Sequence, residues 1–211
     1  MEAINVYRLT GRLAEPPILD HVLRGEAFYS MRVAAKRLSG YEDMLPVTCS
    51  EQLLEGIEAL QENDIVEIRG QIRTYNRRGD TGSRLIITVF ARELDFADEP
   101  AAFVNEAEIE GFVCKPVVYR LTPFGREIAD ILVAVPRRYN KCDHLPAIAW
   151  GRNARFAETL DVGARVRLCG RLQSRRYVKL LEDGSEEERT AYELSCTSIG
   201  RAEHGMSFPG R

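Results

Sequence analysis

The chain has 211 residues, of which 45% are hydrophobic, 29% charged and 8% aromatic, and its net charge is −3 at pH 7. This balance is that of an ordinary globular protein and excludes wholesale disorder. The longest uncharged apolar runs, at 85–91 and 131–136, are far shorter than the ~20 residues that a membrane span requires. Since the first residues also lack a basic segment followed by an apolar one, we expect a cytoplasmic protein with no membrane partner.

Cysteines and histidines are sparse and do not form a recognisable metal or redox motif. The five cysteines include no CxxC pair, and the three histidines lie far apart in the sequence. A disulfide framework, a zinc site or any other cofactor is therefore not expected. The sequence also lacks a phosphate-cradling glycine loop and a nucleophile motif, so we expect a protein that is not an enzyme.

Charge is distributed unequally between the two halves of the chain. Residues 1–100 contain 12 basic and 17 acidic residues, a net charge of −5, whereas residues 101–211 contain 17 basic and 15 acidic residues, a net charge of +2. This asymmetry indicates that the two halves have different surface roles.

The two halves also repeat each other when the sequence is shifted by 100 residues. Positions 5–70 then show 14 identities without a gap, whereas chance would give about four, so we infer a duplicated domain. The identical pairs include Gly11/Gly111, Gly25/Gly125, Val33/Val133, Arg37/Arg137, Asp43/Asp143, Leu45/Leu145 and Gly70/Gly170.

The linker between the copies is expected at the acidic segment 95–103, which contains Pro100 and several small residues. We therefore expect a first domain at 1–98, more acidic and more divergent, and a second domain at 103–201. Residues 202–211 would form a C-terminal tail.

Each copy shows the same order of secondary-structure signals. In the first copy these are a strand at 4–13, an alternating strand at 29–35, a short strand at 45–50, a short helix within 51–62, a strand with a central glycine at 65–75, and a final strand after a turn. The mid-strand glycine is typical of a bulge or sharp bend where a small barrel coils.

This order predicts an all-β protein with short helices, built as two tandem OB-fold five-stranded Greek-key barrels. The pattern alone also permits other small β-barrels. A single-domain sandwich would not explain the period of 100 residues.

The second half carries a more specific set of motifs, in order. They are a Thr122-Pro123-Phe124-Gly125 turn, an apolar strand at 131–135, Trp150-Gly151, and a strand with Val166, Gly170, Leu172, Arg175 and Tyr177. Over nearly all of residues 105–199, this half resembles the bacterial single-stranded DNA-binding protein family. The resemblance implies binding of single-stranded DNA without sequence preference, in DNA replication, recombination or repair, by a nucleoid-associated protein.

The resemblance assigns base stacking to three aromatic residues, Tyr139, Trp150 and Tyr177. Stacking on a flat ring does not discriminate between bases, and nearby cations neutralise phosphates and make binding salt-dependent. The cations that accompany these aromatics are Arg137, Arg138, Lys141, Arg152, Arg171, Arg175, Arg176 and Lys179.

In the first copy Ser39 stands opposite Tyr139 and Ser50 opposite Trp150, so the stacking set is missing at these corresponding positions. Candidates for a weaker contact with DNA remain nearby. They are Arg37, Tyr41, Arg73 and Tyr75.

The family resemblance also implies an assembly that presents four OB domains, so a chain with two copies is expected to form a homodimer. Many relatives end in an acidic, hydrophobic tip that recruits replication partners. This chain ends in RAEHGMSFPGR, so recruitment through such a tail is not expected.

Two alternatives remain open at this point. Trp150 could be a core residue, and the arginines could form a solvated face paired with the acidic stretch 182–188. The protein could then be a replication-accessory or phage-type factor whose OB domains mainly mediate dimerisation or partner binding.

Overall fold

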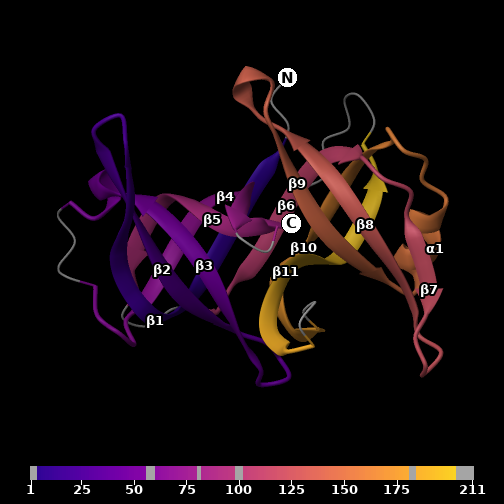
Figure 1. Cartoon of the computed structure of the whole chain (residues 1–211), viewed down its shortest axis with the longest axis horizontal. Helices are drawn as coiled ribbons and strands as arrows, with labels where there is room; N and C mark the ends of the chain where they lie inside the picture. Colours follow the sequence, from indigo (N-terminus) through magenta and orange to yellow (C-terminus); the bar gives the residue numbers. More distant parts are fainter. Residues whose placement is uncertain (1–3, 56–59, 80–81, 98–101, 181–183, 203–211) are drawn as a thin grey trace. The chain divides into compact units, whose positions relative to one another are not determined.

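The computed structural model describes residues 4–55, 60–79, 82–97, 102–180 and 184–202. These residues form two closed barrels, which appear in Figure 1 as indigo to magenta strands and as magenta to yellow strands. The chain is therefore all-β with short helices, as the order of signals predicts. Among the described helices, none is both long and apolar enough to cross a membrane.

The N-terminal barrel closes because every strand has a partner on both sides. β1 pairs with β2 and β4, β2 pairs with β3, β3 runs parallel to β5, and β5 pairs with β4. This circuit is the five-stranded OB-fold. Its elements are β1 (Asn5–Leu23), β2 (Glu26–Lys36), β3 (Glu42–Ser50), a 3₁₀ helix (Glu51–Leu53), β4 (Ile65–Gly79) and β5 (Gly82–Phe96).

The C-terminal barrel repeats the circuit. β6 pairs with β8 and β10, β8 pairs with β9, β9 runs parallel to β11, and β11 neighbours β10. One extra strand, β7, extends β8 as a hairpin. Its elements are β6 (Asn105–Val113), β7 (Val118–Leu121), β8 (Glu127–Pro136), a 3₁₀ turn (Arg138–Asn140), β9 (Cys142–Trp150), α1 (Arg152–Glu158), β10 (Arg165–Leu180) and β11 (Glu186–Arg201).

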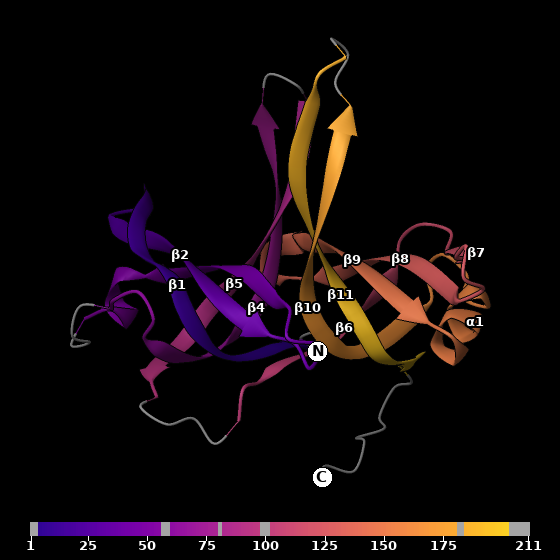
Figure 2. The ribbon, with the colours of Figure 1, turned by 90° about the horizontal axis from the view of Figure 1, so that it is seen from below.

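The chain divides into two compact units, and a segment of the second copy belongs with the first. The N-terminal unit contains residues 6–106 and 172–193, and the C-terminal unit contains residues 1–5, 107–171 and 194–211. Residues 172–193 are the outer part of the β10–β11 hairpin, which Figure 2 shows as a long ribbon, as it does the β4–β5 hairpin. We refer to the described residues of this segment, 172–180 and 184–193, as the outer hairpin.

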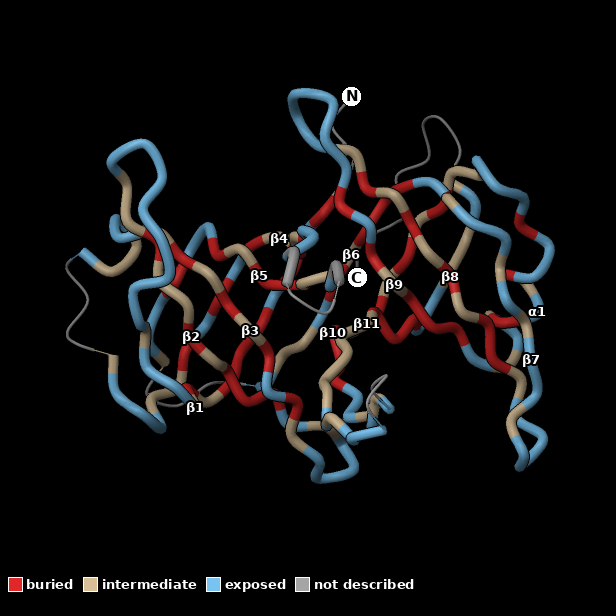
Figure 3. Tube along the Cα trace, in the orientation of Figure 1, coloured by how far each residue is buried: buried red, intermediate tan, exposed pale blue. Residues whose placement is uncertain are grey.

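The core of each barrel comes from alternate residues of its strands. In β8, Ala129, Ile131, Val133 and Val135 are all buried, as their spacing predicts for one face of a strand. Figure 3 shows the same alternation as red segments along the strands.

The repeated glycines mark places where another strand approaches too closely for a side chain. A Cβ atom on Gly11 would lie 2.6 Å from the carbonyl oxygen of Ala34, and one on Gly111 would lie 2.5 Å from that of Ala134. At Gly70 the register of β4 against β5 shifts by one residue, which is the bulge that the mid-strand glycine indicates.

The predicted helix differs between the two copies. In the second copy α1 buries Ala154 and Ala157. In the first copy a 3₁₀ helix spans only Glu51–Leu53, and the rest of the expected helix includes residues 56–59, which lie outside the described part of the chain.

Candidate nucleic-acid interface

Tyr139 is the most exposed of the predicted stacking residues. It lies in the 3₁₀ turn between β8 and β9, and 91% of its surface is exposed. Its backbone has φ 60° and ψ 39°, a left-handed conformation that costs roughly 1–2 kcal/mol for a residue with a side chain. The turn therefore holds an aromatic ring out in solvent at some cost to folding.

Trp150 is the last residue of β9 and lies opposite Ile128 of β8. Its exposed fraction is 41%, so part of the indole is available to a ligand. β9 has nine residues, from Cys142 to Trp150, and is therefore about 26 Å long. Tyr139 lies three residues before its other end. A surface of this length suits OB-fold sites, which cover about 4–16 nucleotides.

The predicted cations of the C-terminal unit differ in how far they are committed to other contacts. Arg137 donates to the buried carboxylate of Asp143 at 3.3 Å. Arg171 is half-buried, and its Nε makes no hydrogen bond within the described structure. Arg137 is nevertheless exposed, as are three further predicted cations of this unit, Arg138, Lys141 and Arg152.

The remaining cations lie on the outer hairpin and belong to the N-terminal unit. The Arg175 guanidinium lies 5.6 Å from the ring centroid of Tyr177, a cation–π distance. On the neighbouring strand Arg189 donates to Glu187 at 2.6 Å. This hydrogen bond is the main reason why the pKa of Arg189 is raised, and the nearby Tyr177 raises it further. The other two predicted cations are Arg176, which is exposed, and Lys179, which is half-buried.

In the first copy, Arg37 and Tyr41 form a second cation–π pair, with 4.7 Å between the guanidinium carbon and the ring centroid. Arg37 also donates to both carboxylate oxygens of Asp43, at 2.6 and 2.7 Å, and this bond raises the pKa of Arg37. Arg37 is therefore neutralised by Asp43, whereas the Tyr41 side chain is 45% exposed.

The other first-copy candidates lie on β4. Tyr75 is 51% exposed, and its pKa is raised by partial burial and then by the nearby charge of Asp20. Arg73 is half-buried and donates to Gln71. These two residues are less suited to phosphate contact than the exposed cations of the second copy.

The structure adds Phe124 to the candidate residues predicted from the sequence. It lies in the turn between β7 and β8, and its exposed fraction is 92%. The signal was present, because the Thr-Pro-x-Gly turn carries an aromatic residue at its third position, followed by Arg126.

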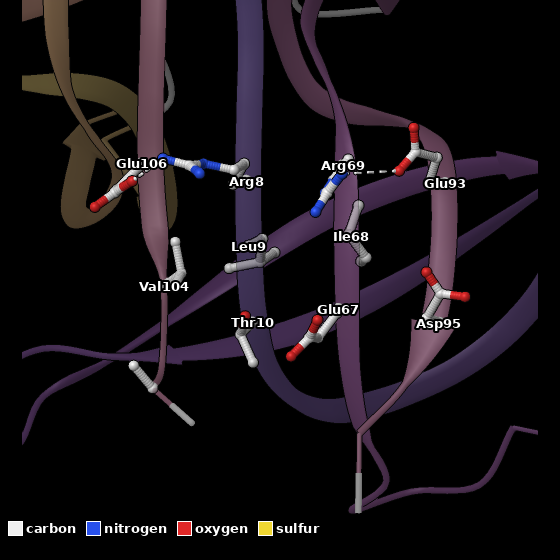
Figure 4. Close-up of a pocket in the computed structure, with 11 residues that line it drawn as sticks. Arg8, Leu9, Thr10, Glu67, Ile68, Arg69, Glu93, Asp95, Val104 and Glu106 are labelled. Carbon is white, nitrogen blue, oxygen red and sulfur yellow. Dashed lines mark hydrogen bonds and ion pairs between the residues drawn. The ribbon is translucent and has the colours of Figure 1, made fainter. Parts of the chain in front are cut away.

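A groove of about 550 Å³ in the N-terminal unit has a different character (Figure 4). Both of its arginines are paired, Arg8 with Glu106 at 2.7 Å and Arg69 with Glu93 at 3.6 Å. The lining also contains the carboxylates of Glu67 and Asp95. This groove, which we call the acidic groove, has a charge unsuited to DNA phosphates.

Exposed aromatic rings beside cations, carried on an OB-fold, are features of proteins that hold single strands. Residues 104–202 match the single-strand binding protein family. The second copy of the repeat therefore belongs to this family. The match falls on the second copy, which also has the positive net charge and the aromatic set of Tyr139, Trp150 and Tyr177.

Two solved structures of a single-stranded DNA binding protein share the fold of the whole chain. The wild-type single-stranded DNA binding protein from Thermus aquaticus is 20% identical, with a TM-score of 0.75, and the similarity covers 100% of this chain and 98% of that chain. A deletion mutant of the same protein is 19% identical, with a TM-score of 0.75 over 99% of this chain and 98% of that chain. No curated protein matches the sequence. The prediction of two tandem OB-fold barrels is thereby confirmed.

Proposed function

We propose that this protein binds single-stranded DNA without sequence preference and acts in DNA replication, recombination or repair. Bases stack on exposed aromatic rings, and phosphates pair with exposed cations. Binding of this kind makes or breaks no covalent bond, so the function requires no catalytic group or cofactor. Such a protein would work in the cytoplasm, associated with the nucleoid.

The observation that carries this proposal is the exposure of Tyr139 in a left-handed turn. The ring contributes little to the barrel core and is held in solvent, next in sequence to Arg138 and two residues from Lys141, both of which are exposed. Stacking on such a ring contributes roughly 1–3 kcal/mol per base for any base. Arg152 follows Trp150 by two residues and supplies an exposed cation at the other end of β9.

The test uses Trp150, the only tryptophan of the chain. We expect its fluorescence to be quenched by a long oligothymidine and not by duplex DNA, and the affinity to fall as salt increases. The salt dependence should follow the release of counterions from the neutralised phosphates.

A parallel mobility-shift gel covers the case in which DNA binds away from the indole. If neither the fluorescence nor the gel responds to the oligothymidine, the protein does not bind single-stranded DNA and the proposal is wrong. Equal affinity for the duplex would show a basic surface without the selectivity that stacking confers.

We further propose that two chains associate as a homodimer, which would present four OB domains. Sedimentation or light scattering should then give twice the chain mass of 23.9 kDa. A monomer at micromolar concentration would contradict this part of the proposal without affecting DNA binding.

The acidic groove supports a second candidate function for the N-terminal unit, the binding of a protein partner. Glu67 and Asp95 face a groove whose arginines are already paired, so a basic protein segment suits it better than DNA. Reversal of both charges, Glu67→Lys with Asp95→Lys, separates the two roles. DNA binding should remain unchanged if the groove serves a partner.

A further inference from the structure

We propose that the loop between β2 and β3 and the outer hairpin form one composite site for single-stranded DNA, in which Tyr41 and Tyr177 stack bases and Asp43 is the positioning residue. The inference rests on the proposed function and adds a site to it, built from both copies of the repeat within the N-terminal unit. Family membership comes from the second copy alone and does not assign such a site.

The buried carboxylate of Asp43 is the point at which the two segments meet. Its Oδ1 accepts hydrogen bonds from the backbone N–H of Ser174 at 2.7 Å and from the Ser174 hydroxyl at 2.8 Å. Both carboxylate oxygens also accept from Arg37. A fully buried charge is stable only with such a complete set of partners, so the loop and the hairpin are fixed together.

Arg37 connects the hydrogen-bonded pair Asp43 and Ser174 to the aromatic ring of Tyr41. Its Nη2 also donates to the carbonyl oxygen of Ser174 at 3.0 Å, while its guanidinium lies over the ring of Tyr41. The next residue after Ser174 is Arg175, whose guanidinium lies over Tyr177. Ser174 of β10 therefore links the cation–π pair of Arg37 and Tyr41 to the pair of Arg175 and Tyr177.

The other strand of the outer hairpin is held on the same barrel. Arg32 donates to the hydroxyl of Tyr192 at 2.6 Å, and that hydroxyl donates to the carbonyl oxygen of Met44 at 3.1 Å. Arg84 donates to the carbonyl oxygen of Thr190 at 3.2 Å. Because both strands of the hairpin are anchored, the site is preorganised and binding need not pay for ordering it.

Charge around the site is also suitable. Arg175 and Arg176 are exposed, and two carboxylates on the segments that form the site make hydrogen bonds to other side chains. Glu42 accepts from Arg12 at 3.1 Å, and Glu193 accepts from Gln173 at 2.9 Å.

The test places one reporter on each side of the composite site. In a Trp150→Phe background, Tyr41→Trp and Tyr177→Trp are made separately and titrated with an oligothymidine of about eight nucleotides, a length within the range of one OB-fold site. One composite site predicts the same Kd and stoichiometry at both reporters. Dissociation constants that differ by about tenfold or more, equivalent to 1.4 kcal/mol, would show two separate sites and overturn the inference.

The positioning role of Asp43 is tested by Ser174→Ala and Asp43→Asn in both reporter proteins. Removal of the Ser174 hydroxyl should weaken binding at both reporters by the same factor, about fivefold. Ser50→Ala, the same change at the far end of β3 where the serine side chain makes no capping hydrogen bond, is the matched control and should leave both values unchanged. An unchanged Kd in Ser174→Ala would contradict the positioning role.

Asp43→Asn distinguishes the positioning role of Asp43 from the effect of its charge, because the two predict opposite changes in DNA affinity. Loss of the carboxylate frees the charge of Arg37 and should by itself tighten DNA binding, whereas loss of positioning weakens it. Tighter binding in a folded variant would overturn the role of Asp43, and if the variant does not fold, Ser174→Ala decides. Quenching of Trp150 in the unmodified chain separately tests the proposed function, so each proposal can fail alone.

Discussion

Gly11 lies against Ala34 of the neighbouring strand so closely that a Cβ atom would stand 2.6 Å from the Ala34 carbonyl oxygen. Gly11→Ala and Gly111→Ala should therefore each lower the free energy of unfolding by about 3 kcal/mol, since the obstacle is backbone that cannot rotate away. Urea denaturation measures the loss. Gly200→Ala is the control, because a Cβ there meets nothing within 4 Å, and it should change stability by less than about 0.5 kcal/mol. Equal effects of the three changes would show that close strand approach is not the reason for the repeated glycine.

Tyr139 should affect DNA binding and folding in opposite directions. Tyr139→Gly removes the exposed ring and relieves a left-handed backbone, so we expect about tenfold weaker binding of oligothymidine and stability that is unchanged or about 1 kcal/mol higher. Filter binding and thermal denaturation measure the two effects. Asn140→Gly, in the same turn with φ 53°, should give the stability change without the loss of affinity. A Tyr139→Gly protein that binds normally would remove Tyr139 from the interface.

The salt dependence of binding should identify the cations that contact phosphates. Arg176→Ala removes an exposed charge of the outer hairpin, so the slope of log K against log salt should decrease by about 0.7, the value for one single-strand phosphate contact. Arg8→Ala, which removes an arginine paired with Glu106 in the acidic groove, should leave the slope unchanged. The reverse pattern would place DNA on the acidic groove.

Stability should fall in alkaline solution through the buried thiol of Cys196. Burial raises the pKa of this thiol to about 12, from an ordinary value of 9.0. The unfolded chain therefore releases the proton above pH about 9 while the folded chain retains it, so the contribution is complete below pH 9 and is lost as the pH rises toward 12. Between pH 8 and pH 10, the wild-type protein should lose about 1 kcal/mol more than Cys196→Ala. Equal losses would mean that the thiol titrates normally in the folded chain.

Much of the fold could be predicted because its constraints are local and occur twice. The alternation at 129–135 fixes one buried face of β8, and the repeated glycines mark close approaches within each barrel. The Arg37/Arg137 and Asp43/Asp143 identities likewise correspond to an ion pair in each copy. The repeat predicted the barrels because each copy closes its own circuit of strands.

The site could be predicted only in part, since its decisive contacts join distant positions. Asp43 and Ser174 are separated by 131 residues, and no periodicity relates an aspartate in one copy to a serine in the other. The exposure of Tyr139 could not be predicted from the sequence either. A tyrosine that follows a strand can pack on the barrel surface or extend into solvent. The roles of these residues in binding DNA stay predictions.

The assignment of the outer hairpin to the N-terminal unit has a consequence for the history of the gene. When two tandem copies fold independently, either one can be deleted and the other remains intact. Here, loss of the second copy would also remove Ser174 and Tyr192, the partners of the buried Asp43 and of Arg32. A shortened descendant would keep the Arg37 ion pair but lose both hydrogen bonds from Ser174 to the Asp43 carboxylate, so the deletion would destabilise the copy that remains and selection would act against it.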